Sequence, residues 1–165
     1  MIPSKIFEKV KRIEIRTRGL VNNLFGGELL ARMDKVASIA AIKHSGSVVV
    51  TASINNVSFG EPVPNGSILT IEAKVSRAFT TSMEVFIDVW KQNKTHPEKF
   101  KVNEAIYTFV AVNRRGKPVK VPKLIPQTDI EINRYDAALR RRQLSLVLAG
   151  KMIPSEASEL KAIFD

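Results

Sequence analysis

The stretch FGGELLARMD, residues 25–34, decides the fold, because a pair of glycines opens a strongly helical segment that carries a carboxylate. The run from Glu28 to His44 contains no Gly or Pro and is rich in Ala, Leu, Ile, Met and Lys, a composition typical of a helix. Spacings of three and four residues place an apolar stripe along one face of this predicted helix: Leu30, Met33, Ala37, Ala40 and Ala41.

Asp34 lies beside that stripe, next to Met33. Burying a carboxylate is costly unless a partner compensates, so an Asp in this place can have a function. A second interpretation is an Asp at the edge of the stripe that simply reaches solvent. The spacing alone leaves both interpretations open.

The chain after the helix has the pattern of an antiparallel sheet. Residues 69–76 and 83–89 alternate between apolar and polar side chains, and Asn65-Gly66 is a strong turn signal. A short segment before the helix, Ile13–Arg16, is expected to add an edge strand. One long helix and four long strands predict an α+β fold in which the sheet wraps its apolar face around the helix. The four β-rich regions are Val48–Phe59, the run from Leu69, the run from Met83 and Lys101–Val112.

Five motifs in order give this pattern a family resemblance. Between Ile13 and Pro122 the sequence resembles the hotdog-fold acyl-CoA thioesterases. That resemblance implies a central helix wrapped by the sheet, hydrolysis of acyl-CoA to free acid and coenzyme A, and a catalytic helical Asp, which is Asp34 here. Asp34 would act as general base on water, in preference to forming an anhydride as a nucleophile. The motifs are Asn22–Gly27, Met33–Asp34, Val57–Phe59 with Pro62 and Gly66, Ala78–Met83, and Asn103–Ala105 leading to Phe109–Val112.

The spacing of Gly27 and Asp34 predicts a site shared between two chains. Seven residues of helix separate them, which is about 10 Å. The helix start offers free N–H groups and a positive dipole end, suited to a developing oxyanion, and glycine permits close approach. A carbonyl bound there cannot also meet Asp34 of the same chain, so two antiparallel helices of a dimer should pair Gly27 of one copy with Asp34 of the other.

The sequence departs from the resembled family at one catalytic position. Relatives usually have an Asn eight residues before the second glycine, and this chain has Gly19 there. Asn22 or Asn23 is close enough in sequence to substitute, and we take Asn23 as the candidate. Asn55, on a predicted strand, also stands where relatives often have an acidic residue.

Composition restricts the remaining possibilities. The 165 residues suit one hotdog domain, residues 1–122, followed by a basic linker and helical tail, residues 123–165. The chain has no cysteine, and neither His44 nor His96 belongs to a ligand-spaced cluster, so no metal is expected. His44, at a helix end, is better explained by a favourable interaction with the helix dipole than by a catalytic role. The charged first residues lack a signal-peptide core and no apolar run is long enough to cross a bilayer, which predicts a cytoplasmic protein.

The net charge of +10 is concentrated toward the C-terminus. Residues 113–151 contain ten basic and three acidic side chains, and a helix is expected from Asn133 to Leu148, closed by Gly150. Ala137, Leu144 and Leu148, and also Ala138 and Leu139, could pack on the domain, while residues 140–142, three arginines, project over much of the circumference. Such a surface suits the phosphates of coenzyme A, although arginines that only face solvent are an equal alternative.

The candidate coenzyme-binding residues come from two places. The Thr80-Thr81-Ser82 hairpin lines the pantetheine groove in the resembled family, with an arginine close by; its alternative is an ordinary turn. The basic region of residues 113–151 supplies the others. The full set is Arg77, Thr80, Thr81, Ser82, Arg114, Arg115, Lys117 and Arg140.

These observations predict an acyl-CoA thioesterase, with coenzyme A as part of the substrate and no separate cofactor. Gly19 makes a non-catalytic acyl-CoA-binding or regulatory protein the alternative. A hotdog dehydratase fits less well, because neither histidine lies where the helix meets the sheet. Nucleic acid is a remote partner, since few aromatic residues are interleaved with the charges. The free edge of a single hotdog sheet predicts at least a dimer, and the resemblance implies a trimer of dimers.

Overall fold

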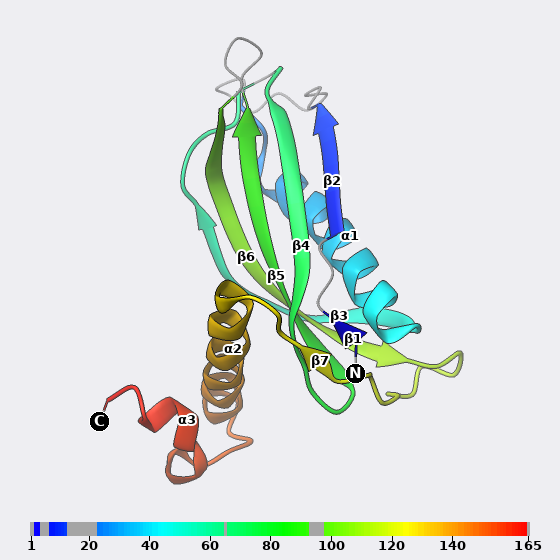
Figure 1. The fold of residues 1–165 in the computed structure, drawn as a ribbon, viewed down its shortest axis with the longest axis vertical. Coiled ribbons are helices and arrows are strands. Elements are labelled where there is room, and N and C mark those ends of the chain that lie inside the picture. The colour runs from blue at the N-terminus through cyan, green and yellow to red at the C-terminus, as the bar shows by residue number, and fades with distance from the viewer. Residues whose placement is uncertain (1, 4–6, 13–22, 65, 93–97, 165) are drawn as a thin grey trace.

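A computed structural model describes residues 2–3, 7–12, 23–64, 66–92 and 98–164 of the chain. A five-stranded antiparallel sheet has α1 on one face and α2 on the other (Figure 1). The strand order is β2-β4-β5-β6-β3, and β1 and β7 form a separate parallel pair. In chain order the elements are β1 (Ile2–Pro3), β2 (Phe7–Arg12), α1 (Gly26–Ser45), β3 (Val48–Phe59), β4 (Ile68–Ala78), β5 (Ser82–Gln92), β6 (Lys99–Val112), β7 (Leu124–Ile125), α2 (Asp129–Leu148), the 3-10 turn Pro154–Glu156 and α3 (Ser158–Lys161).

Helix α1 confirms the predicted central helix and corrects its buried face. The helix ends at Gly46, whose left-handed backbone (φ 66°) lets its N–H bond the carbonyl of Ile42 at 2.8 Å. Leu30, predicted to head the apolar stripe, is only partly buried, and the neighbouring Leu29 takes that place, four residues before Met33. The buried face consists of Leu29, Met33, Val36, Ala37, Ala40, Ala41 and His44.

The four long strands lie where the alternation predicted them, and β6 begins two residues early, at Lys99. The inward-facing side chains of β4, β5 and β6 are buried under α1. The predicted edge segment, Ile13–Arg16, lies outside the described residues, and the described strand at that edge is β2, which pairs with β4. Strand β3 forms the opposite edge and is largely exposed. The inward-facing set on β4 and β5 is Leu69, Ile71, Ala73, Val75, Met83, Val85, Ile87 and Val89.

Two outward-facing carboxylates of β5 are buried too, because side chains of α2 pack over them. Glu84 and Asp88 retain only 4% and 8% of their exposure. Helix α2 begins at Asp129, four residues before the predicted start, with the Thr128 hydroxyl accepting the Glu131 N–H at 3.3 Å.

The buried side of α2 differs from the prediction. Leu144 and Leu148 were expected to pack and are instead 43% and 79% exposed, while Ala138 is fully buried. The helix meets the sheet through arginines as well as small residues, so its apolar positions do not mark its contact face. Gly150, at φ 66°, follows the helix end as predicted.

None of the helices in the described residues is long and apolar enough to cross a membrane. The division into residues 1–122 and 123–165 stays a prediction.

Candidate active site

Asp34 is held by the strand that faces it. Its Oδ1 accepts a hydrogen bond from the Thr51 hydroxyl of β3 at 2.8 Å, and the carboxylate is partly exposed. Helix α1 supplies the carboxylate and the edge strand orients it. Among the described residues no hydrogen bond to the second carboxylate oxygen is seen, and a base acting on water requires such an oxygen.

Tyr107 of β6 lies fully buried beneath the same turn of α1. Its hydroxyl donates to the Leu30 carbonyl at 3.1 Å, the acceptor that the Asp34 N–H also uses within an α-helix. Burial, together with the negative charge of Asp34, raises the pKa of Tyr107 to about 12. The ring stacks on Phe109 at 6.2 Å, and Phe109 pairs with Thr51 across the ladder. The Tyr107 hydrogen bond thus holds the turn of α1 that carries Asp34 against strand β6.

The start of α1 leaves two glycine N–H groups at an exposed helix end. The Phe25 carbonyl accepts the N–H of Glu28 and of Leu29, so the first-turn donors without a partner among the described residues belong to Gly26 and Gly27. A Cβ at Gly27 would come within 3.0 Å of the Phe25 ring, which gives a steric reason for glycine in addition to ligand access. Both Gly27 and Asp34 belong to α1, at the spacing that keeps them about 10 Å apart.

The asparagine candidates are placed as follows. Asn23 precedes α1 and forms a backbone bridge with Pro64, beside a hydrogen bond from Leu24 N to the Val63 carbonyl at 2.9 Å. Gly19, Asn22 and His96 lie outside the described residues. The catalytic role of Asn23 stays a prediction. Asn55 is exposed on β3, and its amide donates to the Ser53 hydroxyl.

The hairpin between β4 and β5 is tied into the fold through its backbone. Phe79 N bonds the Ser82 carbonyl, and the carbonyls of Thr80 and Thr81 accept from Val121 and Ala111 at 3.1 and 2.9 Å. These carbonyls are therefore occupied, while the Thr80 side chain remains exposed. Contact of this hairpin with pantetheine stays a prediction.

Arg77, at the end of β4, faces α2. Its guanidinium donates to the Tyr135 carbonyl at 2.8 Å and lies 4.0 Å from the centre of the Tyr135 ring. This contact packs the helix on the sheet. A hydrogen bond from Arg77 to a coenzyme would have to come from the guanidinium N–H groups that the Tyr135 carbonyl does not use.

The arginines of α2 do not simply surround the helix. Arg141 makes a bidentate pair with the buried Glu84, at 2.7 and 3.0 Å. Arg142 donates to the Ser82 hydroxyl at 3.2 Å and covers the Phe79 ring, and burial lowers its pKa. Arg140 shows no such contact among the described residues, so of this run it is the one most open to a ligand.

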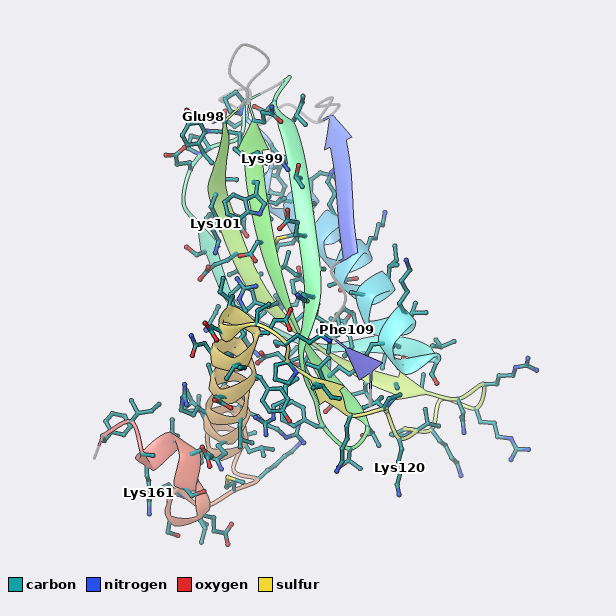
Figure 2. All side chains as sticks on the ribbon, viewed as in Figure 1. Glu98, Lys99, Lys101, Phe109, Lys120 and Lys161 are labelled. Carbon is teal, nitrogen blue, oxygen red and sulfur yellow. The ribbon has the colours of Figure 1, made fainter. Side chains whose placement is uncertain are left out.

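The other basic candidates lie in an exposed turn after β6. The Asn113 side chain accepts the N–H groups of Arg115 and Lys117, and Gly116 provides the required positive φ of 72°. In Figure 1 this turn and α2 lie on opposite sides of the sheet's lower end. Figure 2 labels two other lysines of the C-terminal part, Lys120 after this turn and Lys161 of α3, and they lie on opposite sides of the view as well. Within one protomer these basic groups do not form one patch.

Two cavities in the protomer, of about 430 and 550 Å³, lie under α2 on the outer face of the sheet. Neither is lined by Asp34 or Thr51. The carboxylate thus lies outside both cavities, near the exposed edge strand.

Sequence reasoning missed Thr51 and Tyr107, because each reads as an ordinary strand residue. Their relation to Asp34 depends on which strand lies against α1, and no local motif encodes that. His44 was assigned to the helix dipole; it is buried, with Nε2 2.9 Å from the Pro122 carbonyl.

Comparison with known proteins agrees with this geometry. Residues 21–97 match the Thioesterase superfamily. The uncharacterized acyl-CoA thioester hydrolase YkhA of Bacillus subtilis is 38% identical over 120 residues, covering 73% of this chain and 70% of that protein. The chain belongs to the hotdog-fold acyl-CoA thioesterase family.

Solved structures extend the likeness to the whole fold of this thioesterase. An acyl-CoA hydrolase from Staphylococcus aureus, in complex with butyryl coenzyme A and coenzyme A, matches with a TM-score of 0.81 and 34% identity. The match covers 92% of this chain and 94% of that chain. An apo hexameric acyl-CoA thioesterase matches with a TM-score of 0.83 and 34% identity, over 88% and 92% of the two chains.

Proposed function

We propose that this thioesterase hydrolyses acyl-CoA with Asp34 as the general base. The observation that carries the proposal is the 2.8 Å hydrogen bond from Thr51 to one oxygen of a partly exposed Asp34 carboxylate. The bond fixes one oxygen and leaves the other for water. An Asp without a defined orientation would be a weaker candidate, because general-base catalysis depends on placing the base within reach of the proton.

The reaction follows from these positions. Asp34 takes a proton as water attacks the thioester carbonyl, and the resulting oxyanion is stabilised by the Gly27 N–H at the start of α1 in a second copy. Collapse of the tetrahedral intermediate breaks the carbon–sulfur bond, the leaving thiolate takes up the proton held by Asp34, and coenzyme A and the free acid are released. Coenzyme A is part of the substrate, and no other cofactor takes part.

The coenzyme phosphates are proposed to bind either the exposed Arg114, Arg115 and Lys117 or the partly exposed Arg140. Neutralising a true contact should weaken coenzyme A more than its 3′-dephospho analogue, and added salt should weaken the two in the same order. Equal losses for both ligands would assign the cation a structural role.

The assembly is proposed to be at least a dimer and, by analogy with the hexameric relatives, a trimer of dimers. Among the described residues strand β3 has no neighbour at one edge of the sheet, and it exposes apolar side chains at Val48, Val50 and Ile54. Mixing inactive Asp34→Asn chains with inactive chains altered at Gly27 should restore activity, because a mixed dimer holds one intact site. No recovery despite proven subunit exchange would contradict the shared site.

The activity test is release of thiol from a panel of acyl-CoA substrates. Asp34→Asn keeps the shape and the hydrogen bond from Thr51 but removes the basic group, so kcat should fall by roughly 10² or more with coenzyme binding kept. Unchanged kcat in the folded variant would remove Asp34 from the mechanism. Tight binding without turnover by the wild type would favour a regulatory acyl-CoA-binding protein. Localisation in the cytoplasm stays a prediction.

A further inference from the structure

Asn103 of β6 is a buried amide with no partner. Its side chain is 4% exposed, and neither Oδ1 nor Nδ2 has a hydrogen-bond partner among the described residues. Two other buried polar atoms lack a bond, in Arg32 and Asp88, but both residues are held by ion pairs. Asn103 is thus the only described residue whose whole buried polar group is unpaired. Such a group destabilises a fold, and its presence calls for a ligand or a function.

The position of Asn103 relates it to the start of α1. Asn103 pairs across the ladder with Phe59, and the Phe59 ring lies 3.3 Å from where a Cβ of Gly26 would be. On its other side Asn103 pairs with Val89, a fully buried residue of the inner face. The amide therefore belongs to the layer between sheet and helix, at the N-terminal end of α1.

The direction of β6 places the amide just past that end. Strand and helix run the same way, since Thr51, opposite Phe109, bonds Asp34 while Tyr107 bonds Leu30, one helical turn earlier. From Tyr107 back to Asn103 the strand extends about 13 Å. From Leu30 back to the first residue of α1 the helix extends only about 6 Å. Asn103 thus lies beyond the first turn, on the side toward which the free N–H groups point.

We propose that the Asn103 side chain donates a hydrogen bond from Nδ2 to the carbonyl oxygen of the substrate thioester, as a second donor beside the Gly27 N–H. A carbonyl bound at the start of α1 lies beyond the helix end, which is where the amide lies. A thioester oxygen is an acceptor, and Nδ2 offers two unused donors. The inference rests on the proposed function, and it adds a substrate-contacting residue supplied by the sheet.

The first experiment substitutes Asn103→Leu, which keeps the size and removes the polar atoms. Removing an unpaired buried amide should raise the melting temperature, while loss of one oxyanion donor should lower kcat by roughly 10²-fold. The matched control is Thr70→Val, a buried polar residue of β4 with 2% exposure, for which kcat should not change. A higher melting temperature with unchanged kcat would overturn the proposal and leave the amide to an ordered water.

The second experiment measures binding and does not depend on turnover. A ketone analogue of acyl-CoA keeps the carbonyl, and an alkyl thioether of coenzyme A lacks it. Asn103→Leu should weaken the ketone by about tenfold and leave the thioether unchanged. If the variant binds the ketone as tightly as the wild type does, the inference is overturned. This outcome can be read even if the wild type proves to have no thioesterase activity.

If the Leu variant misfolds, the smaller variant Asn103→Ala replaces it. We expect the same fold-changes in kcat and in ketone binding from Asn103→Ala. Failure of both variants to fold would also overturn the proposal, because it would mean that the amide is paired within the assembled protein.

Discussion

The two faces of the central sheet are held by different forces, although the same strands build both. On β5, Val85 and Ile87 face α1 and are completely buried among apolar side chains. Glu84 and Asp88, on the opposite face of that strand, are nearly as buried and are held by arginines of α2. An alternating pattern thus identifies the apolar face of a strand but does not show that its polar face is open to water.

The difference separates the charges that hold the fold together from the charge that we propose acts in catalysis. On the outer face each buried carboxylate has a cation, for example Arg134 on Asp88 at 2.9 Å, and these pairs attach α2 to the sheet. On the inner face the one carboxylate, Asp34, has only a neutral hydroxyl partner among the described residues. Substitutions on the outer face should therefore change stability, and those near Asp34 should change turnover.

The largest stability effect in this comparison is expected from Arg141→Leu. This change leaves the Glu84 carboxylate, 4% exposed, without its cation. Stranding a buried charge destabilises strongly, and because Arg141 itself is about a quarter exposed we expect a loss of about 2 kcal/mol. Urea unfolding of the intact assembly measures it, with Arg140→Leu as the control expected to stay within about 0.5 kcal/mol. Equal losses for the two variants would mean that the pair does not hold α2.

Thr51→Val tests the inner face. The substitution is close to isosteric on a β-strand and removes the hydroxyl that orients Asp34. We expect kcat to fall about tenfold, equivalent to about 1.4 kcal/mol, with little change in stability. Steady-state kinetics gives the result, and Ser53→Ala, on the same strand, is the control. A rise in KM with unchanged kcat would show that Thr51 binds substrate without aligning the base.

The inner face could be predicted from the sequence, because one physical rule governs it. The alternation of apolar residues predicted the strands, and the run without Gly or Pro between Gly27 and Gly46 predicted α1. The role of the arginines could not be predicted in this way. Whether Arg141 meets solvent, a phosphate or Glu84 depends on how α2 docks, and 57 residues separate those two partners. Thr51 and Tyr107 were missed for the same reason.

Tyr107→Phe should have a smaller effect, because it removes one hydrogen bond and keeps the stacked ring. We expect a loss of about 1 kcal/mol, and the loss should depend on pH at the alkaline end. The pKa of Tyr107 is raised to about 12 from an ordinary value of about 10, so the folded state favours the neutral phenol. The wild type should therefore keep this stability below pH 10 and lose it between about pH 10 and 12. The Phe variant should lack that component of the alkaline transition, and absorbance of tyrosinate during alkaline titration locates it. An ordinary phenol titration in the folded wild type would contradict the buried environment.

The smallest effect is expected from Glu131→Gln at the start of α2. Burial alone would raise the pKa of Glu131, but the Lys74 ammonium and the Gln127 N–H outweigh it, so that pKa lies below its ordinary value. A lowered carboxyl pKa contributes stability that is present above the ordinary value of about 4.3 and is lost as the pH falls through the folded value. We expect the variant to be less stable by about 0.5 kcal/mol at pH 7, since Gln can still accept the backbone N–H while Lys74 can turn to water. The melting temperatures of variant and wild type should converge as the pH drops below 4. A difference that persists in acid would mean that Glu131 holds α2 by packing and hydrogen bonding alone, with no contribution from its charge.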